Sequence, residues 1–280
     1  MSKKEEQYHS LVRRLSQCKQ CEKLATSDGK NSGLDNRAKD SGVMNLWNCW
    51  QGSLDAKIIV IGQDYGNYPE LTESRKRYYD IATCKSGEAW IFNEKKKLIS
   101  DLKSAKKYMG ATDANLWWLF HEVLGIDMAV KRDTLFFTNM ACCYRKPKEK
   151  ISGSIHSCWL PYCSSYFMGE LIGIIKPKAI IALGKPVLDA LKYCKDSKFI
   201  CQKNSNVDAT MSDKYSNLIA FDYFLKLPEA DEMRVFPVYH PGAYSTVNRP
   251  LTGENPKDRN CQSADWKKIK KWLEREKIKL

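Results

Sequence analysis

Four short apolar runs, each followed directly by a glycine or a polar residue, constrain the fold of this chain more than any other feature. They lie at residues 57–61, 134–138, 179–183 and 235–239. The first three are continuous and rich in β-branched or aromatic residues, which is typical of strands buried on both faces of a parallel sheet. The fourth contains Pro237, which favours a sheet edge or a strand end. We therefore expect a central sheet of four mainly parallel strands.

Helical patterns fill the intervals between these runs. They lie at residues 98–109, 116–124, 166–175 and 186–193, and two more are found near the ends, at residues 8–15 and 264–275. Strands that alternate with helices form parallel sheets covered by helices on both faces. The sequence therefore predicts an α/β fold, a three-layer sandwich around the four-stranded sheet.

The remaining segments are expected to belong to a single domain that spans residues 1–280. Residues 23–48 are rich in Gly, Ser, Asp and Asn and indicate a long loop. Residues 195–232 have weak patterning and indicate an insertion. No apolar run approaches the ~20 residues of a bilayer helix, and the first residues lack the apolar part of a secretory signal. We expect a soluble, cytoplasmic monomer with no membrane contact.

Polar side chains follow the strands at the edge where open α/β sheets bind their ligands. Gln63 and Asp64 follow the first run, Asn139 the second, Lys185 the third and His240 the fourth. An acid, an amide and an imidazole are therefore expected to converge there. The competing interpretation, ordinary strand-end turn residues, requires an independent coincidence at each position.

With these residues in this order, the chain resembles the uracil-DNA glycosylase superfamily, in particular its iron–sulfur, family-four-like branch. The resemblance covers about residues 11–275 and rests on four landmarks: Cys18 and Cys21, Gly62-Gln63-Asp64, Thr138-Asn139 with Cys143, and His240-Pro241-Gly242. The first motif diverges, because Gln63-Asp64 is closer to the cluster-free branch and Tyr65-Gly66 replaces the Pro-Tyr found there. Strict uracil specificity is therefore left open.

The resemblance implies an enzyme that flips a base out of DNA and hydrolyses its N-glycosidic bond. Asp64 would stabilise the cationic sugar and orient water, and His240 would stabilise the departing base. The residues expected to contact the base are Gln63, Tyr65, Phe92 and Asn139. Uracil excision in base-excision repair is the leading hypothesis. The alternatives are the same chemistry on a modified pyrimidine of foreign (phage) DNA, as a defence enzyme, and a non-catalytic, metal-containing nucleic-acid-binding protein.

The chain has 11 cysteines, and in a reducing compartment these argue against a disulfide framework. The resemblance implies a 4Fe–4S cluster held by four thiolates, those of Cys18, Cys21, Cys143 and Cys163. Cys142 and Cys158 are the alternatives for the last two ligands. Zinc, which binds the same thiolates, is the alternative metal.

The chain carries 46 Lys and Arg against 33 Asp and Glu, a net charge of +13. Such a surplus favours a polyanionic partner such as DNA, although a solvated basic surface gives the same count. The side chains expected to contact DNA beside the strand ends are Arg145, Lys146 and Lys185. The resemblance implies that Arg249 and Tyr244 lie in a loop that enters the minor groove, with Arg249 contacting the DNA and Tyr244 as the wedge. The lysines of the last helix are expected to be solvated.

Overall fold

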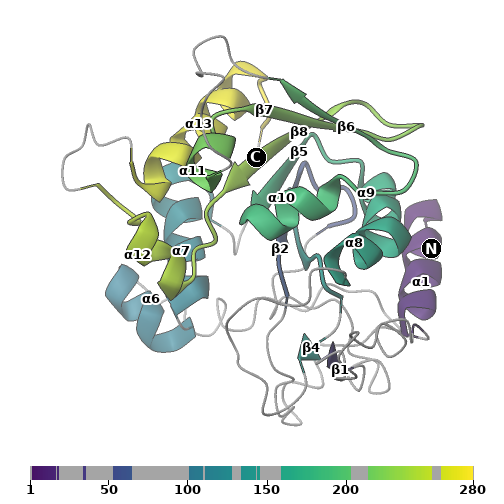
Figure 1. Cartoon of the computed structure of the whole chain (residues 1–280), viewed down its shortest axis with the longest axis horizontal. Helices are drawn as coiled ribbons and strands as arrows, with labels where there is room; N and C mark the ends of the chain where they lie inside the picture. Colours follow the sequence, from purple (N-terminus) through teal and green to yellow (C-terminus); the bar gives the residue numbers. More distant parts are fainter. Residues whose placement is uncertain are drawn as a thin grey trace.

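The computed structural model describes residues 2–16, 18, 34–35, 53–64, 101–109, 111–127, 134–142, 144–145, 159–202, 214–253 and 260–279 of the chain. Within these ranges the centre of the molecule is a six-stranded sheet in the order β3-β2-β5-β8-β7-β6 (Figure 1). Its strands are β2 (Ile58–Gly62), β3 (Leu135–Asn139), β5 (Ala179–Leu183), β6 (Lys198–Gln202), β7 (Asp222–Lys226) and β8 (Met233–Val238).

The four predicted strands are confirmed as parallel neighbours at the heart of this sheet. Ile58 of β2 is in register with Leu135 of β3 and Ala179 of β5, and Ala179 is in register with Arg234 of β8. β2, β3 and β5 are buried along their whole length, as their continuous apolar sequences predict. Because the register is level, the carboxyl ends of all four strands meet at one edge.

The sheet has two more strands than predicted, and both come from the segment interpreted as an insertion. β6 and β7 pair antiparallel with each other, and β7 pairs antiparallel with β8. β6 is largely exposed, and in β7 the buried Tyr223 and Leu225 alternate with more exposed residues, so neither strand has the continuous apolar run of a strand buried on both faces. β8 is therefore an interior strand. Its pairing with β7 ends at Val235, so Pro237 lies beyond that ladder, as its missing N–H requires.

Helices cover both faces of the sheet, which confirms the predicted three layers. One face carries α1 (Lys3–Ser16), α8 (Trp159–Cys163), η3 (Ser164–Met168), α9 (Gly169–Ile175) and α10 (Lys185–Leu191). The other carries α6 (Leu102–Met109), α7 (Ala111–Trp118), η2 (Leu119–Leu124) and α13 (Gln262–Arg275). Alternate strand residues divide between the two cores: Ile59 belongs to the first and Ile58 to the second.

Shorter elements complete the described part of the chain. They are the strands β1 (Leu34–Asp35) and β4 (Tyr144–Arg145), which pair antiparallel with each other, and the helices α11 (Tyr215–Leu218) and α12 (Ala243–Asn248). α12 follows β8 after a short turn (Figure 1), and that turn contacts α7 through the bond from Asn115 to Pro241. Among the described helices, none combines the length and the apolar character needed to cross a bilayer.

Candidate active site

The carboxyl ends of β2 and β3 place the first two predicted site residues next to each other. Gly62 is in register with Asn139. Beyond the strands, the Met140 N–H donates to the Gly62 carbonyl (2.8 Å) and the Ala141 N–H donates to the Gln63 carbonyl (2.9 Å). These two bonds extend the strand pairing past the end of the sheet. The polypeptide that carries Gln63 and Asp64 therefore lies alongside the one that carries Asn139.

Asp64 and Asn139 differ in how the structure holds them. The Gln63 side chain donates to Asp64 Oδ2 (3.0 Å), and both residues are partly exposed. Asn139, by contrast, is buried, with only 3% of its surface exposed. An amide carries both a donor and an acceptor, so it can pair with a ligand that supplies both.

His240 reaches the same edge from the end of β8. The Gly242 N–H donates to His240 Nδ1 (3.0 Å), so in the neutral ring the proton resides on Nε2. Burial lowers the pKa of His240 below its usual 6.5, and the nearby Asp64 carboxylate partly opposes this by raising it. The structure therefore brings Asp64 and His240 into electrostatic contact, with the imidazole neutral near pH 7.

Two glycines allow the imidazole to sit where it does. Gly184, with φ of 98°, donates its N–H to the Val238 carbonyl (2.7 Å) and ties the end of β5 to the end of β8. A Cβ on Gly242 would lie 2.9 Å from His240 Nδ1. Both positions therefore depend on the absence of a side chain, the first for its backbone conformation and the second for space.

Asn115 is a site-supporting residue that the sequence analysis missed. Its side chain, 2% exposed on α7, donates to the Pro241 carbonyl (2.7 Å). This bond fixes the His240-Pro241-Gly242 turn to the helix layer. The predicted helix began one residue later, at residue 116, so Asn115 was outside it. A polar residue directly before an apolar helical stretch was the available signal.

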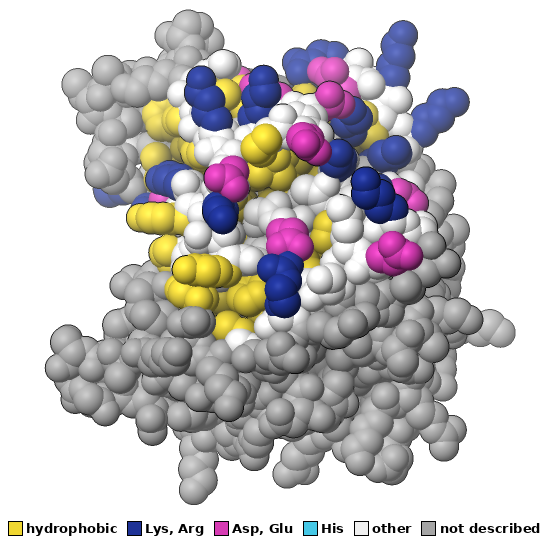
Figure 2. Space-filling view, turned by 90° about the vertical axis from the view of Figure 1, so that its right-hand side faces the viewer, with side chains coloured by type: hydrophobic (Ala, Val, Ile, Leu, Met, Phe, Trp, Pro, Cys, Tyr) yellow, Lys and Arg dark blue, Asp and Glu magenta, His cyan; other side chains and the backbone are white. Residues whose placement is uncertain are grey.

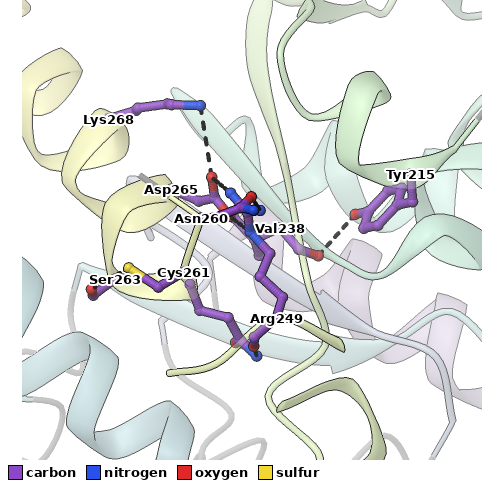
Figure 3. A network of polar contacts seen from close by, with 9 residues as sticks. Tyr215, Val238, Arg249, Asn260, Cys261, Ser263, Asp265 and Lys268 are labelled. Atoms are coloured by element: carbon purple, nitrogen blue, oxygen red, sulfur yellow. Dashed lines mark hydrogen bonds and ion pairs between the residues drawn. The ribbon is translucent and has the colours of Figure 1, made fainter. Parts of the chain in front are cut away.

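Arg249 does not occupy the position predicted for it. The residue is 6% exposed, and its Nε and Nη2 donate to Oδ2 (2.6 Å) and Oδ1 (2.8 Å) of Asp265 on α13. Figure 3 shows the side chain extended toward that carboxylate. A planar guanidinium is well matched by a bidentate carboxylate. The predicted phosphate contact by Arg249 is therefore wrong, because its fork of donors is already engaged inside the protein.

The other predicted DNA contacts fall at the surface or outside the described residues. Lys185 is exposed and pairs with Asp189 (2.6 Å). For Arg145 in β4 and Tyr244 in α12 the structure describes the backbone alone. Tyr65, Phe92 and Lys146 lie outside the described residues. Val247 on α12, which was not predicted, is an apolar side chain that is 81% exposed.

Two of the four predicted metal ligands lie near each other. Cys163 is buried at the end of α8, and Cys18, just after α1, packs against the same core. Both influence Tyr162: its pKa is raised to about 12 by burial and by the neighbouring Cys18, Tyr166 and Cys163 groups. Cys21, Cys143 and Cys158 lie outside the described ranges. Within those ranges no three side chains converge on a metal-binding position.

The described surface around α1, α9 and β6 carries both positive and negative side chains. Figure 2 shows Lys and Arg side chains interspersed with Asp and Glu on this face. Arg14 pairs with Glu170 and Lys178 pairs with Asp231. Exposed pairs of this kind have little net effect on stability and reduce the local attraction for phosphate. The excess of positive charge is thus not concentrated on the described part of this face.

The comparisons with known proteins agree with this geometry. The sequence model of the uracil DNA glycosylase superfamily matches residues 49–270. That range contains all four parallel strands together with Asp64, Asn139 and His240, whereas Cys18 and Cys21 precede it. A search of curated proteins finds no match. The chain belongs to the uracil DNA glycosylase superfamily, a family of hydrolases that remove bases from DNA.

Proposed function

We propose that this protein removes uracil from DNA by hydrolysing its N-glycosidic bond, in base-excision repair. The observation that carries the proposal is the position of His240. Its Nδ1 accepts a hydrogen bond from Gly242, its Nε2 bears the proton, and the Asp64 carboxylate lies near enough to influence it. One hydrogen-bond donor and one negative charge therefore share the sheet edge. The reaction develops opposite charges on the base and the sugar, and this pair matches them.

His240 would act on the departing base. As the C1′–N bond breaks, its electron pair leaves with the base, and negative charge builds on the carbonyl oxygen of the base. A neutral imidazole whose Nε2–H is already oriented donates a hydrogen bond to that oxygen without reorganisation. Burial keeps the ring neutral by lowering its pKa. The Gly242 N–H selects the tautomer.

Asp64 would act on the sugar. The carboxylate stabilises the oxocarbenium-like cation and orients the water whose oxygen bonds to C1′ and whose proton is then released. The hydrogen bond from Gln63 orients the Asp64 carboxylate. Asn139 would read the pyrimidine edge with its amide, and Tyr65 or Phe92 would stack on the flipped base.

The first motif bears on which base is the substrate. Tyr65-Gly66 follows Gln63-Asp64 in the first motif, and this departure favours one competing substrate, a modified pyrimidine of foreign DNA. The test uses matched duplexes that carry uracil, thymine or 5-substituted pyrimidines, with abasic sites detected by alkaline cleavage. Excision of uracil alone supports the proposal, whereas excision confined to a modified base would replace uracil as the substrate.

The assigned roles predict how variants behave in the same assay. Asp64→Asn and His240→Ala are each expected to lower the single-turnover rate by about 100-fold or more. Gln202→Ala, on exposed β6, is the control and should retain the wild-type rate. Wild-type activity in the Asp64→Asn, His240→Ala double variant would refute the roles. Cleavage of no substrate by the wild type would refute the enzymatic proposal itself.

We also propose that Lys185 and Val247 contact the DNA. The ion pair of Lys185 with Asp189 is exposed, so exchanging that partner for a phosphate costs little. Val247 projects from α12, immediately after the His240 turn. An exposed apolar side chain at this place is suited to enter the stack when a base leaves it, and it is a candidate wedge alongside Tyr244.

Finally, we propose a 4Fe–4S cluster held by Cys18, Cys21, Cys143 and Cys163. The support in the structure is the proximity of Cys18 and Cys163 to Tyr162. The cluster would join the end of α1 to α8 and would have no part in bond cleavage. Iron and sulfide content with a broad visible absorption would support it, while stoichiometric zinc would identify the alternative metal. Loss of metal in Cys158→Ser but not in Cys163→Ser would reassign the ligand.

A further inference from the structure

The buried Arg249–Asp265 pair joins the polypeptide after the His240 turn to α13. Besides its two bonds to Asp265, the Arg249 guanidinium donates to Asn260 Oδ1 (2.9 Å). Lys268 Nζ approaches the same Asp265 carboxylate from outside, at 3.7 Å. The Arg249 and Asp265 side chains are 8% and 3% exposed. The pair is thus almost fully buried, and its hydrogen-bond partner Asn260 and its outer neighbour Lys268 lie next to or on α13.

The backbone around Arg249 is fixed to the same helix. The Gln262 side chain donates to the Arg249 carbonyl (3.1 Å). The Gln262 and Ser263 N–H groups donate to the carbonyls of Pro250 (2.8 Å) and Leu251 (3.0 Å). The first turn of a helix has N–H groups without partners inside the helix, and here the returning chain satisfies two of them. The end of the segment that begins at His240 is therefore held firmly.

Arg249 also reaches back to the residue before His240. Its Cζ lies 5.3 Å from the ring centroid of Tyr239, a favourable cation–π separation. The same ring contacts the Tyr215 ring edge-on, with centroids 5.0 Å apart. Tyr215 in turn donates its hydroxyl to the Val238 carbonyl (2.8 Å), as Figure 3 shows. Arg249, at one end of the segment that carries the imidazole, thus contacts Tyr239 at the other end.

A buried ion pair is a poor way to gain stability. Removing both charges from water is costly, and well-packed apolar replacements are often equally stable or more so. What the pair does provide is directional geometry, since the bidentate bonds fix where the guanidinium lies. We propose that Arg249 and Asp265 are positioning residues for His240, which hold the Tyr239–Arg249 segment so that the imidazole stays in its hydrogen bond with Gly242. This inference rests on the proposed glycosylase function.

The test replaces both charges at once, as Arg249→Met with Asp265→Leu, so that neither is left buried and unpaired. The matched control is Arg234→Met with Asp222→Leu. That pair also joins an arginine to an aspartate, and its guanidinium lies over the rings of Phe224 and Phe236. It sits at the other end of β8, away from the site. For each variant three quantities are measured: the single-turnover excision rate, the Kd for uracil-containing duplex, and the His240 tautomer by ¹⁵N NMR, assigned with His240→Gln.

The expected result is a rate about 10- to 100-fold lower in the Arg249/Asp265 variant, with a Kd within about twofold of wild type. The His240 Nδ1 signal should move from an unprotonated ring nitrogen toward a mixture of tautomers. The control should change neither rate nor tautomer. An unchanged rate and tautomer in the first variant, or equal losses in the control, would overturn the inference.

The experiment also gives an answer if the wild type is inactive or if the double variant does not fold. If the wild type cleaves no substrate, the proposed function fails, and the tautomer measurement still decides whether the pair positions His240. If the double variant does not fold, Arg249→Lys takes its place. Lysine keeps the charge and lacks the planar fork, so the rate and the tautomer should change in the same direction. Wild-type values of both in Arg249→Lys would overturn the inference.

Discussion

Gly242→Ala is expected to move the His240 imidazole with little effect on the fold. A Cβ at this position would lie 2.9 Å from His240 Nδ1 and 3.2 Å from Cε1. Ordinary contacts begin near 3.4 Å, so the ring must retreat by about half an ångström or rotate. The backbone of Gly242 has φ of −68°, which any residue adopts. The strain therefore falls on the mobile end of His240 and not on the polypeptide.

The kinetic cost of this shift is large because catalysis depends on position. A displacement of about 1 Å can lower a rate by about 100-fold, and moving the ring also weakens the Gly242 N–H···Nδ1 bond that selects its tautomer. We expect the single-turnover excision rate to fall by about 10- to 100-fold. The free energy of unfolding should fall by at most about 1 kcal/mol, since one hydrogen bond contributes roughly that amount.

The control for this prediction is another glycine-to-alanine change. A Cβ on Gly173 in α9 would meet Leu227 Cδ1 at 3.7 Å, an ordinary contact on the opposite layer of the fold. Gly173→Ala should leave excision unchanged, and it should not lower stability, because alanine is favoured over glycine inside a helix. Excision by Gly242→Ala at the wild-type rate would refute the reasoning, and so would a loss of excision that tracks a loss of folded protein.

Three more outcomes follow from the same geometry. Excision should decline as the pH falls through the pKa of His240, which lies below 6.5, because the neutral ring is then lost. Asp64→Asn should lower that pKa further, since the Asp64 carboxylate raises it. A pH–rate profile in which the acid limb lies above 6.5 would contradict this. Asn115→Ala leaves the buried Pro241 carbonyl without its donor, so urea unfolding should show a loss of about 1–3 kcal/mol; unaltered stability would argue against the bond. Val247→Ser should slow excision from duplex DNA more than from single strands, as only the duplex needs a wedge; equal effects on both would exclude that role.

The parallel part of the sheet was predictable because buried strands are apolar on both faces. The runs at β2, β3 and β5 stand out in the sequence, and each was assigned within a residue or two. β6 and β7 were missed for the opposite reason. β6 is largely exposed and β7 alternates buried with more exposed residues, so polar and apolar side chains mix. Their places in the sheet depend on pairing, of β7 with β8 and of β6 with β7, and not on their own composition.

The candidate site divides in the same way. Asp64, Asn139 and His240 could be predicted because a strand end is visible in the sequence and the sheet edge collects whatever follows it. The contacts that Asn115 and Asp265 make with the segment after β8 could not be predicted, because the two residues lie on helices 125 residues before His240 and 25 residues after it. Only the tertiary arrangement shows that a helix amide serves the Pro241 carbonyl.

Arg249 shows why the net charge of +13 is an unreliable guide to where DNA binds. The count gives every cation equal weight, yet Arg249 is neutralised inside the protein by Asp265, and Lys192 shares Asp189 with Lys185 at the surface. Phosphate binding requires a cation that can exchange its partner at little cost, and exposure decides that. A buried, bidentate pair cannot be exchanged without stranding a carboxylate in the interior. Arg249 is therefore assigned to the geometry of His240, and an exposed cation such as Lys185 is of the kind that can contact phosphate.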